Sequence, residues 1–138
     1  MLSLKSFYVG TSREVDVINI GHDVRGFVRE AKIENGLVTV ACRLPGGGVA
    51  LLTTDGKAVQ QIREQVKKDF SQSLSAGFKY LLPPALSVPI ENGKMIFEPW
   101  QDLYLVDFEA SGRRREVVIQ IFSEPKEQAG APGKGARR

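Results

Sequence analysis

Three consecutive arginines, Arg113, Arg114 and Arg115, form the densest positive cluster in the part of the chain that is expected to fold. A guanidinium group presents its N–H donors in a planar fork, so it can hold a phosphate by two hydrogen bonds at once. A fourth arginine, Arg43, directly precedes the stretch LPGGGVALL. We therefore predict that these four arginines are candidates for binding an anion, with solvated charges in a turn as the alternative.

The glycine run Gly46–Gly48 raises the question of a phosphate-binding loop. A P-loop needs backbone N–H groups at the start of a helix, together with a lysine and a serine or threonine. Here the run precedes VALL, a strand pattern, and the stretch 43–52 contains no lysine, serine or threonine. The sequence therefore excludes a P-loop. It leaves open a plain turn between strands, or a nest of glycine N–H groups that binds an anion with help from Arg43.

The residues that usually carry catalysis or bind metals are scarce. His22 is the only histidine and Cys42 the only cysteine, so a single chain cannot assemble a cluster of His and Cys ligands. His22 stands beside Asp23 at the expected start of a helix, where a capping or surface role is typical. The carboxylates show no paired spacing that is typical of acid–base catalysis. We predict no metal site and can name no catalytic residue.

Composition indicates one soluble globular domain. The 138 residues include 42% hydrophobic and 25% charged residues, and the formal net charge is +3. The last ten residues, AGAPGKGARR, account for that whole charge through one lysine and two arginines. The rest of the chain is balanced, so its charge gives no reason to expect nucleic-acid binding. We predict a single domain over residues 1–124 and a disordered basic tail over residues 125–138.

Location is inferred from what the sequence lacks. No apolar run approaches the roughly 18 residues of a membrane span, and the first ten residues, MLSLKSFYVG, lack the apolar core of a secretory signal. A single cysteine cannot form an intrachain disulfide, which fits a reducing compartment. We expect a cytoplasmic protein without membrane contact.

The pattern of apolar residues predicts two helices among many strands. Val24, Phe27, Val28 and Ala31 recur at helical spacing and end before Asn35-Gly36, which easily adopts a left-handed conformation. Glu91–Gly93 reads as a tight hairpin turn because Asn-Gly accepts positive φ. The sequence predicts a second helix at 56–70 and strands at 13–20, 37–42, 49–53, 85–90, 94–97, 103–109 and 116–122. Together they predict an α+β fold with largely antiparallel pairing.

The C-terminal half, LLPPALSVPIENGKMIFEPWQDLYLVDFEASGRRREVVIQIFSE, resembles the YjbQ family, also described as secondary thiamine-phosphate synthases. INIGHDVRGFVREAKIENGLVTV resembles the family's N-terminal half, and the likeness spans roughly residues 5–124. The residues that carry it are Leu86, Pro89, Gly93, Met95, Trp100, Gln101, Phe108, Glu109, Arg113, Arg114, Arg115 and Glu124. The resemblance implies a mostly antiparallel β-sandwich with two helices that assembles as a homotrimer, with pockets near the subunit boundaries.

The family's two polar motifs are missing from this chain. Leu44 stands where the resemblance implies a histidine, Gly46 replaces a hydroxyl residue, and Leu52 stands where an asparagine is expected. The second motif, Asp-Asn-Ala-x-x-His, should fall in SQSLSAGFKY, a segment around Ala76 without Asp, Asn or His. Leucine offers neither a lone pair nor a proton for acid–base work. We therefore interpret Leu44, Gly46, Leu52 and Ala76 as a vacated family site.

Three functions are compatible with these observations. The first is a divergent, non-catalytic YjbQ-like homo-oligomer whose ligand is unknown, with a small phosphorylated molecule as a candidate, and which needs no cofactor. The second is a transferase that resembles thiamine-phosphate synthase, joins phosphorylated heterocycles with Mg²⁺, and uses Arg113–Arg115, Asp55 and Glu109. The third is a nucleic-acid-associated protein that binds through the basic tail. We favour the first.

Overall fold

The structure is a computed structural model that describes residues 2–43, 46–70 and 83–124. The predicted tail at 125–138 lies outside the described residues, as do Leu44 and Ala76 of the predicted vacated site. No helix in the described part of the chain is long and apolar enough to span a lipid bilayer.

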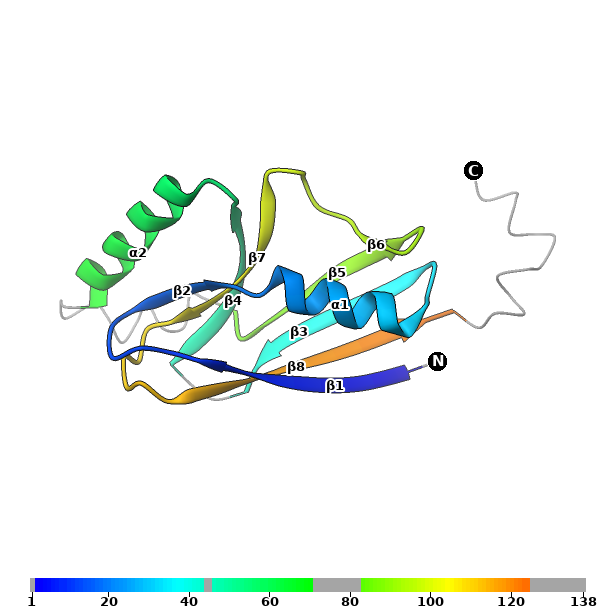
Figure 1. Ribbon diagram of the computed structural model, residues 1–138, viewed down its shortest axis with the longest axis horizontal. Helices are drawn as coiled ribbons and strands as arrows, with labels where there is room; N and C mark the ends of the chain where they lie inside the picture. Colours follow the sequence, from blue (N-terminus) through cyan, green and yellow to red (C-terminus); the bar gives the residue numbers. More distant parts are fainter. Residues whose placement is uncertain (1, 44–45, 71–82, 125–138) are drawn as a thin grey trace.

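The larger of two antiparallel sheets has five strands (Figure 1). In order across the sheet they are β1 (Leu2–Gly10), β8 (Arg114–Ser123), β3 (Gly36–Cys42), β5 (Ala85–Glu91) and β6 (Lys94–Met95). β8 lies inside the sheet, where it pairs with β1 on one side and with β3 on the other.

The smaller sheet has three strands, β2 (Asp16–Asn19), β7 (Gln101–Asp107) and β4 (Gly47–Thr53), with β7 in the middle. Every strand pair in both sheets is antiparallel. With two helices, this confirms the predicted α+β class with largely antiparallel pairing.

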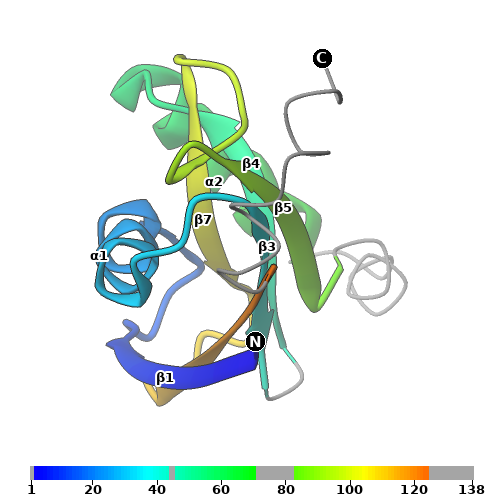
Figure 2. The ribbon, with the colours of Figure 1, turned by 90° about the vertical axis from the view of Figure 1, so that its right-hand side faces the viewer.

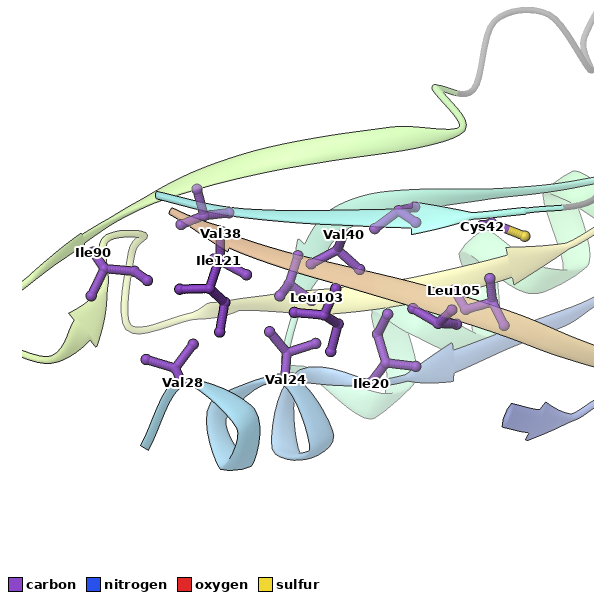
Figure 3. Packing of buried hydrophobic residues seen from close by; sticks show 14 residues of the cluster. Ile20, Val24, Val28, Val38, Val40, Cys42, Ile90, Leu103, Leu105 and Ile121 are labelled. Atoms are coloured by element: carbon purple, nitrogen blue, oxygen red, sulfur yellow. The ribbon is translucent and has the colours of Figure 1, made fainter. Parts of the chain in front are cut away.

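The main core lies between the five-stranded sheet on one side and β7 and helix α1 (Gly21–Ala31) on the other. Val24 and Val28 of α1 point toward the sheets, as the helical spacing predicts (Figure 3). β8 contributes every second residue, including Val117, Ile119 and Ile121, because side chains alternate between the two faces of a strand. Figure 2 shows α1 lying beside the sheets at one edge of the molecule.

Helix α2 (Gly56–Phe70) covers the opposite face of the three-stranded sheet (Figure 1). A second apolar cluster forms there, in which Val59 and Val66 of α2 meet Val17, Tyr104 and Val106. β7 is therefore buried on both faces, by the main core on one side and by α2 on the other.

Several predicted elements match the structure, while two of the predicted strand pairings do not. The helix at 56–70 and the turn at Asn92-Gly93, with φ of 54° and 80°, are confirmed. The first helix ends earlier than predicted, at Ala31, because Lys32 adopts the left-handed conformation. The sequence predicted that strands 37–42 and 49–53 are joined by a turn at 43–48, and that strands 103–109 and 116–122 are joined by one at 110–115. In the structure β3 and β4 lie in different sheets, as do β7 and β8, so neither pair forms a hairpin.

Candidate functional site

The arginine run 113–115 is divided by the fold. Arg115 points into the protein and is fully buried, because it lies on the same face of β8 as Val117 and Ile119. Its Nη2 donates to Asp107 Oδ1 at 3.1 Å and to Glu109 Oε1 at 3.0 Å. This placement corrects the expectation that all three arginines face an external anion, since the charge of Arg115 is neutralised inside the fold.

The glycine run packs directly over this buried ion pair. A Cβ added at Gly46 would lie 2.8 Å from Arg115 Nη2 and 2.8 Å from Glu109 Cβ, and Gly46 has a φ of +91° that disfavours other residues. Gly46 also accepts a hydrogen bond from the Phe108 N–H at 2.9 Å. A close approach to Arg115 is therefore a sufficient structural reason for glycine at this position.

Arg113 contacts the same carboxylate oxygen of Glu109. Its Nε lies 3.1 Å from Glu109 Oε1, and its side chain is partly exposed. Its backbone carbonyl accepts a hydrogen bond from Thr11 Oγ1 at 2.6 Å. Glu109 thus links Arg113 to Arg115 and keeps Arg113 at the loop that precedes β8.

Arg114 and Arg43 meet on the outer face of the five-stranded sheet. They line a surface pocket of about 460 Å³ with Tyr8 and Glu116, which we call the arginine pocket. The Arg114 guanidinium lies 4.5 Å from the centre of the Tyr8 ring, a cation–π contact. Arg43 Nη1 lies 3.5 Å from Glu116 Oε1. The structure therefore brings together two of the four arginines predicted to bind an anion.

Strand pairing explains how the arginine pocket forms. Tyr8 lies directly opposite Glu116 in the β1–β8 pair, and Arg114 is two residues before Glu116 on the same face of β8. The Arg43 N–H donates to the Glu116 carbonyl at 3.2 Å, which places Arg43 on the other side of β8. Tyr8 and Glu116 were not among the residues predicted to bind an anion. The alternation of residues 114–123 places Glu116 on the same face as Arg114. Tyr8 could then have been found opposite Glu116 if residues 2–10 had been recognised as the neighbouring strand.

Leu52, part of the predicted vacated site, is half-buried on β4. It packs against the apolar cluster between the three-stranded sheet and α2. The side chain at this position is therefore engaged in hydrophobic packing beneath a helix.

The remaining candidates for chemistry are scattered. His22 is exposed in the first turn of α1. Asp55 accepts a hydrogen bond from the Lys57 N–H at 3.2 Å and so caps α2, next to the Thr53 end of β4. Glu109 lies beyond the other end of that strand, so the two carboxylates are separated by about the length of seven strand residues, roughly 20 Å. Among the residues that the structure describes, no group of three His, Cys, Asp or Glu side chains could hold a metal ion.

Asp102 is a buried carboxylate with several partners, and nothing in its spacing indicated this. Asp102, at the start of β7, is buried and accepts hydrogen bonds from Asn19 Nδ2 at 3.1 Å and Arg25 Nη1 at 3.0 Å. It lies against Gly21, where any Cβ would overlap the carboxylate. Its contacts join β2, β7 and the start of α1, which is a structural role.

The fold and the pocket together define an α+β protein of two antiparallel sheets that carries an arginine-lined site on its surface. Residues 5–124 match the model of the family described as UPF0047 protein YjbQ-like. The match covers most of the chain, and the protein belongs to this family.

Known relatives agree with this assignment. A UPF0047 protein of Methanothermobacter thermautotrophicus is 22% identical over 127 residues, covering 83% of this chain and 88% of the relative. A YjbQ-like protein of unknown function from Sulfolobus solfataricus has a similar fold, with a TM-score of 0.82 and 20% identity over 90% of this chain and 99% of that one. A YjbQ/UPF0047 family protein of Clostridium acetobutylicum gives a TM-score of 0.76 and 23% identity over 86% and 99% of the two chains.

Proposed function

We propose that this protein is a non-catalytic member of its family that binds a small phosphorylated ligand in the arginine pocket. The observation that carries this proposal is the convergence of Arg43 and Arg114 beside the Tyr8 ring. Packing at Gly46 and Leu52 supports the absence of catalysis, because both positions are engaged in the protein's own contacts.

The chemistry of the arginine pocket suits a phosphate ester. Its two guanidinium groups outnumber the single carboxylate of Glu116, so the lining carries a net positive charge. The Tyr8 ring orients the guanidinium of Arg114, and this reduces the loss of side-chain freedom when an anion binds. A phosphate would take over Arg43 from Glu116, whose contact at 3.5 Å is long for a hydrogen bond.

Titration calorimetry with inorganic pyrophosphate tests this proposal. We expect saturable binding that Arg114→Ala weakens about tenfold or more, the loss expected when one charge-assisted contact is removed. Arg113→Ala is the matched control, because Arg113 pairs with Glu109 outside the pocket. Unchanged binding by Arg114→Ala, or an equal loss in both variants, would contradict the proposal.

The alternative is a transferase that resembles thiamine-phosphate synthase and acts with Mg²⁺. It would require Asp55, Glu109 and the arginines to converge, whereas Asp55 and Glu109 lie beyond opposite ends of β4 in one chain. An assay that supplies the two phosphorylated precursors and Mg²⁺ separates the proposals. We expect no thiamine phosphate above a heat-inactivated control, and formation of product would favour the transferase.

We further propose that the protein functions as a homo-oligomer, and specifically as a trimer. The outer face of the five-stranded sheet supports this, because it exposes a row formed by Leu2, Phe122 and Leu37 on three adjacent strands. Leu4 lies next to this row on β1 and is 66% exposed. The arginine pocket lies on the same face, so an assembly through this face would bring the pocket close to a subunit boundary.

A further inference from the structure

A second cavity, of about 390 Å³, lies between α1 and the β5–β6 hairpin, and we call it the hairpin pocket. We propose that it binds a small amphipathic organic acid, with an apolar body inside the pocket and a carboxylate or phosphate head at its rim. This inference does not depend on the arginine pocket, which is built from β1, β8 and the end of β3.

The floor of the hairpin pocket is apolar. Val28 of α1 is 3% exposed and belongs to the main core, and Figure 3 shows it facing the core from α1. Met95 and Phe97 are half-buried and pack against that core from the hairpin side. A hydrocarbon group in this pocket would therefore be in contact with an extension of the core, and Met95 can adjust its flexible side chain to different shapes.

The rim of the hairpin pocket is positively charged. Arg25 and Arg29 lie four residues apart on α1, so both flank Val28 on the same face of the helix, and Lys94 approaches from β6. Among the described residues that line the cavity, none is acidic. Arg25 is tied to Asp102, whereas neither Arg29 nor Lys94 forms an ion pair within residues 2–43, 46–70 and 83–124. Two exposed cations are thus free to meet an anionic head group.

The hairpin that closes the pocket is held in place by its backbone. The Gly93 N–H donates to the Glu34 carbonyl at 2.9 Å, which ties the turn to the loop after α1. The Ile96 N–H donates to the Pro89 carbonyl, also at 2.9 Å, and fixes the chain beyond β6. A pocket formed before binding loses less conformational freedom when a ligand enters.

The volume and chemistry define the ligand class. Pockets for small molecules span about 300–1,000 Å³, so this cavity is at the small end of the range and suits one ring or a short alkyl chain. The apolar floor would not favour a bare phosphate, and the three cations would not favour a neutral hydrocarbon. Both halves of the ligand are needed.

Titration of the full chain with phenyl phosphate and with phenylacetate tests the proposal, with inorganic phosphate and benzyl alcohol as the two half-ligands. Calorimetry measures affinity, and nuclear magnetic resonance maps the amides that respond. We expect at least one of the two acids to bind, with its largest shifts at residues 92–97 and with each half-ligand about tenfold weaker or more. The stronger acid identifies the head group. Equal affinity of inorganic phosphate measured at residues 92–97, or shifts confined to Tyr8 and Arg114, would overturn the proposal.

The double variant Arg29→Ala/Lys94→Ala removes the two exposed cations from the rim. We expect it to raise the Kd of the stronger acid about tenfold or more. Lys57→Ala, which removes an exposed lysine from α2, is the matched control and should bind as the wild type does. Arg114→Ala should leave the shifts at residues 92–97 unchanged, which separates the hairpin pocket from the arginine pocket. Wild-type affinity in the double variant would refute the assignment.

Discussion

Arg115 illustrates at the scale of one residue how burial changes the role of a charge. The side chains of Arg115 and Asp107 are both fully buried, out of reach of water. Each charge is therefore stabilised by the other instead of by hydration. We predict that Arg115→Met lowers the free energy of unfolding by about 3–5 kcal/mol, because Asp107 would be left as an uncompensated buried charge. Urea denaturation followed by circular dichroism measures the loss.

Two further variants test that explanation. Arg113→Ala removes the neighbouring, partly exposed arginine and should cost no more than about 1 kcal/mol. Arg115→Met combined with Asp107→Leu should recover much of the stability, since no unpaired charge remains. If Arg113→Ala destabilises the protein as much as Arg115→Met, burial is not the cause.

Gly21 at the start of α1 is a second position where a single residue decides local packing. A methyl group there would overlap the carboxylate of Asp102, which is itself held by Asn19 and Arg25. We predict that Gly21→Ala destabilises the protein by about 1–3 kcal/mol, the usual cost of overpacking. Thermal or urea unfolding gives the value.

Gly26, five residues along the same helix, is the matched control. The nearest atom to an added Cβ is Arg29 Nη2, 3.9 Å away, which is an ordinary contact. Gly26→Ala should therefore stabilise the protein by about 0.5–1 kcal/mol through helix propensity. If Gly26→Ala also lowers stability, the cost of alanine in this helix is general and is not caused by the overlap with Asp102.

Residue types identified the arginine cluster, but not how it is divided. The apolar pattern predicts that the last strand begins at residue 116, with residues 113–115 in a loop. β8 in fact begins at Arg114. Once a strand includes Arg114 and Arg115, their side chains must point to opposite faces, one to solvent and one to the core. A shift of two residues in a strand boundary therefore decides which arginine can meet a ligand.

At the scale of elements, prediction succeeded where the apolar pattern had one clear period. The helix at 56–70 has its apolar residues on one stripe and forms with the predicted bounds. β1 was missed because both of its faces carry apolar residues. Phe7 and Val9 pack against the core, while Leu2, Leu4 and Tyr8 are exposed on the outer face. A strand with apolar residues on both faces shows no alternation to detect.

Helix α2 is linked to the segment before β2 by an ion pair between Lys67 and Glu14, 2.9 Å apart. The hydrogen bond from Lys67, and then its charge, lower the pKa of Glu14 below its ordinary 4.5, and Glu14 raises the pKa of Lys67 above 10.5. Glu14 contributes to folding stability above its unfolded pKa, and this contribution is lost as the pH falls through its lowered folded pKa. Lys67 contributes to folding stability below its unfolded pKa, and this contribution is lost as the pH rises through its raised folded pKa.

We therefore predict that Glu14→Gln lowers the urea midpoint slightly near pH 7, and that this difference from the wild type shrinks as the pH falls below the ordinary glutamate pKa of 4.5. The midpoint measured across pH 3–8 provides the test. Glu30→Gln, an exposed substitution on α1, serves as the control and should show no such pH-dependent difference. A difference at pH 3 as large as that at pH 7 would mean that Glu14 acts through something other than its charge.

At the scale of the whole molecule, the outer face of the five-stranded sheet changes character along its strands. One end carries the apolar row of Leu2, Phe122 and Leu37, and the other carries Arg114, Glu116 and Tyr8. An exposed apolar patch next to a polar region is typical of a protein interaction surface.

We predict that the wild-type chain has the mass of three chains in multi-angle light scattering, and that Phe122→Glu shifts it toward one chain. A charge at the centre of the apolar row would have to lose its hydration in the interface. Trp100→Glu changes an equally exposed apolar residue in the connection between β6 and β7, and it should keep the wild-type mass. A wild-type protein with the mass of one chain would contradict the proposed trimer.

Composition and periodicity alone determined the α+β class, the second helix, the tight turn at Asn92-Gly93, and the scarcity of groups for acid–base catalysis. These features depend on residue type and on spacing within one segment, which the sequence states directly. Only the tertiary structure decided that Arg115 neutralises Asp107, that Arg114 joins Arg43 and Tyr8, and that Arg29 and Lys94 lie at the rim of one cavity. Those outcomes depend on which strands become neighbours and on which face of the sheet each side chain lies. Both are set by pairing between segments that are distant in the sequence.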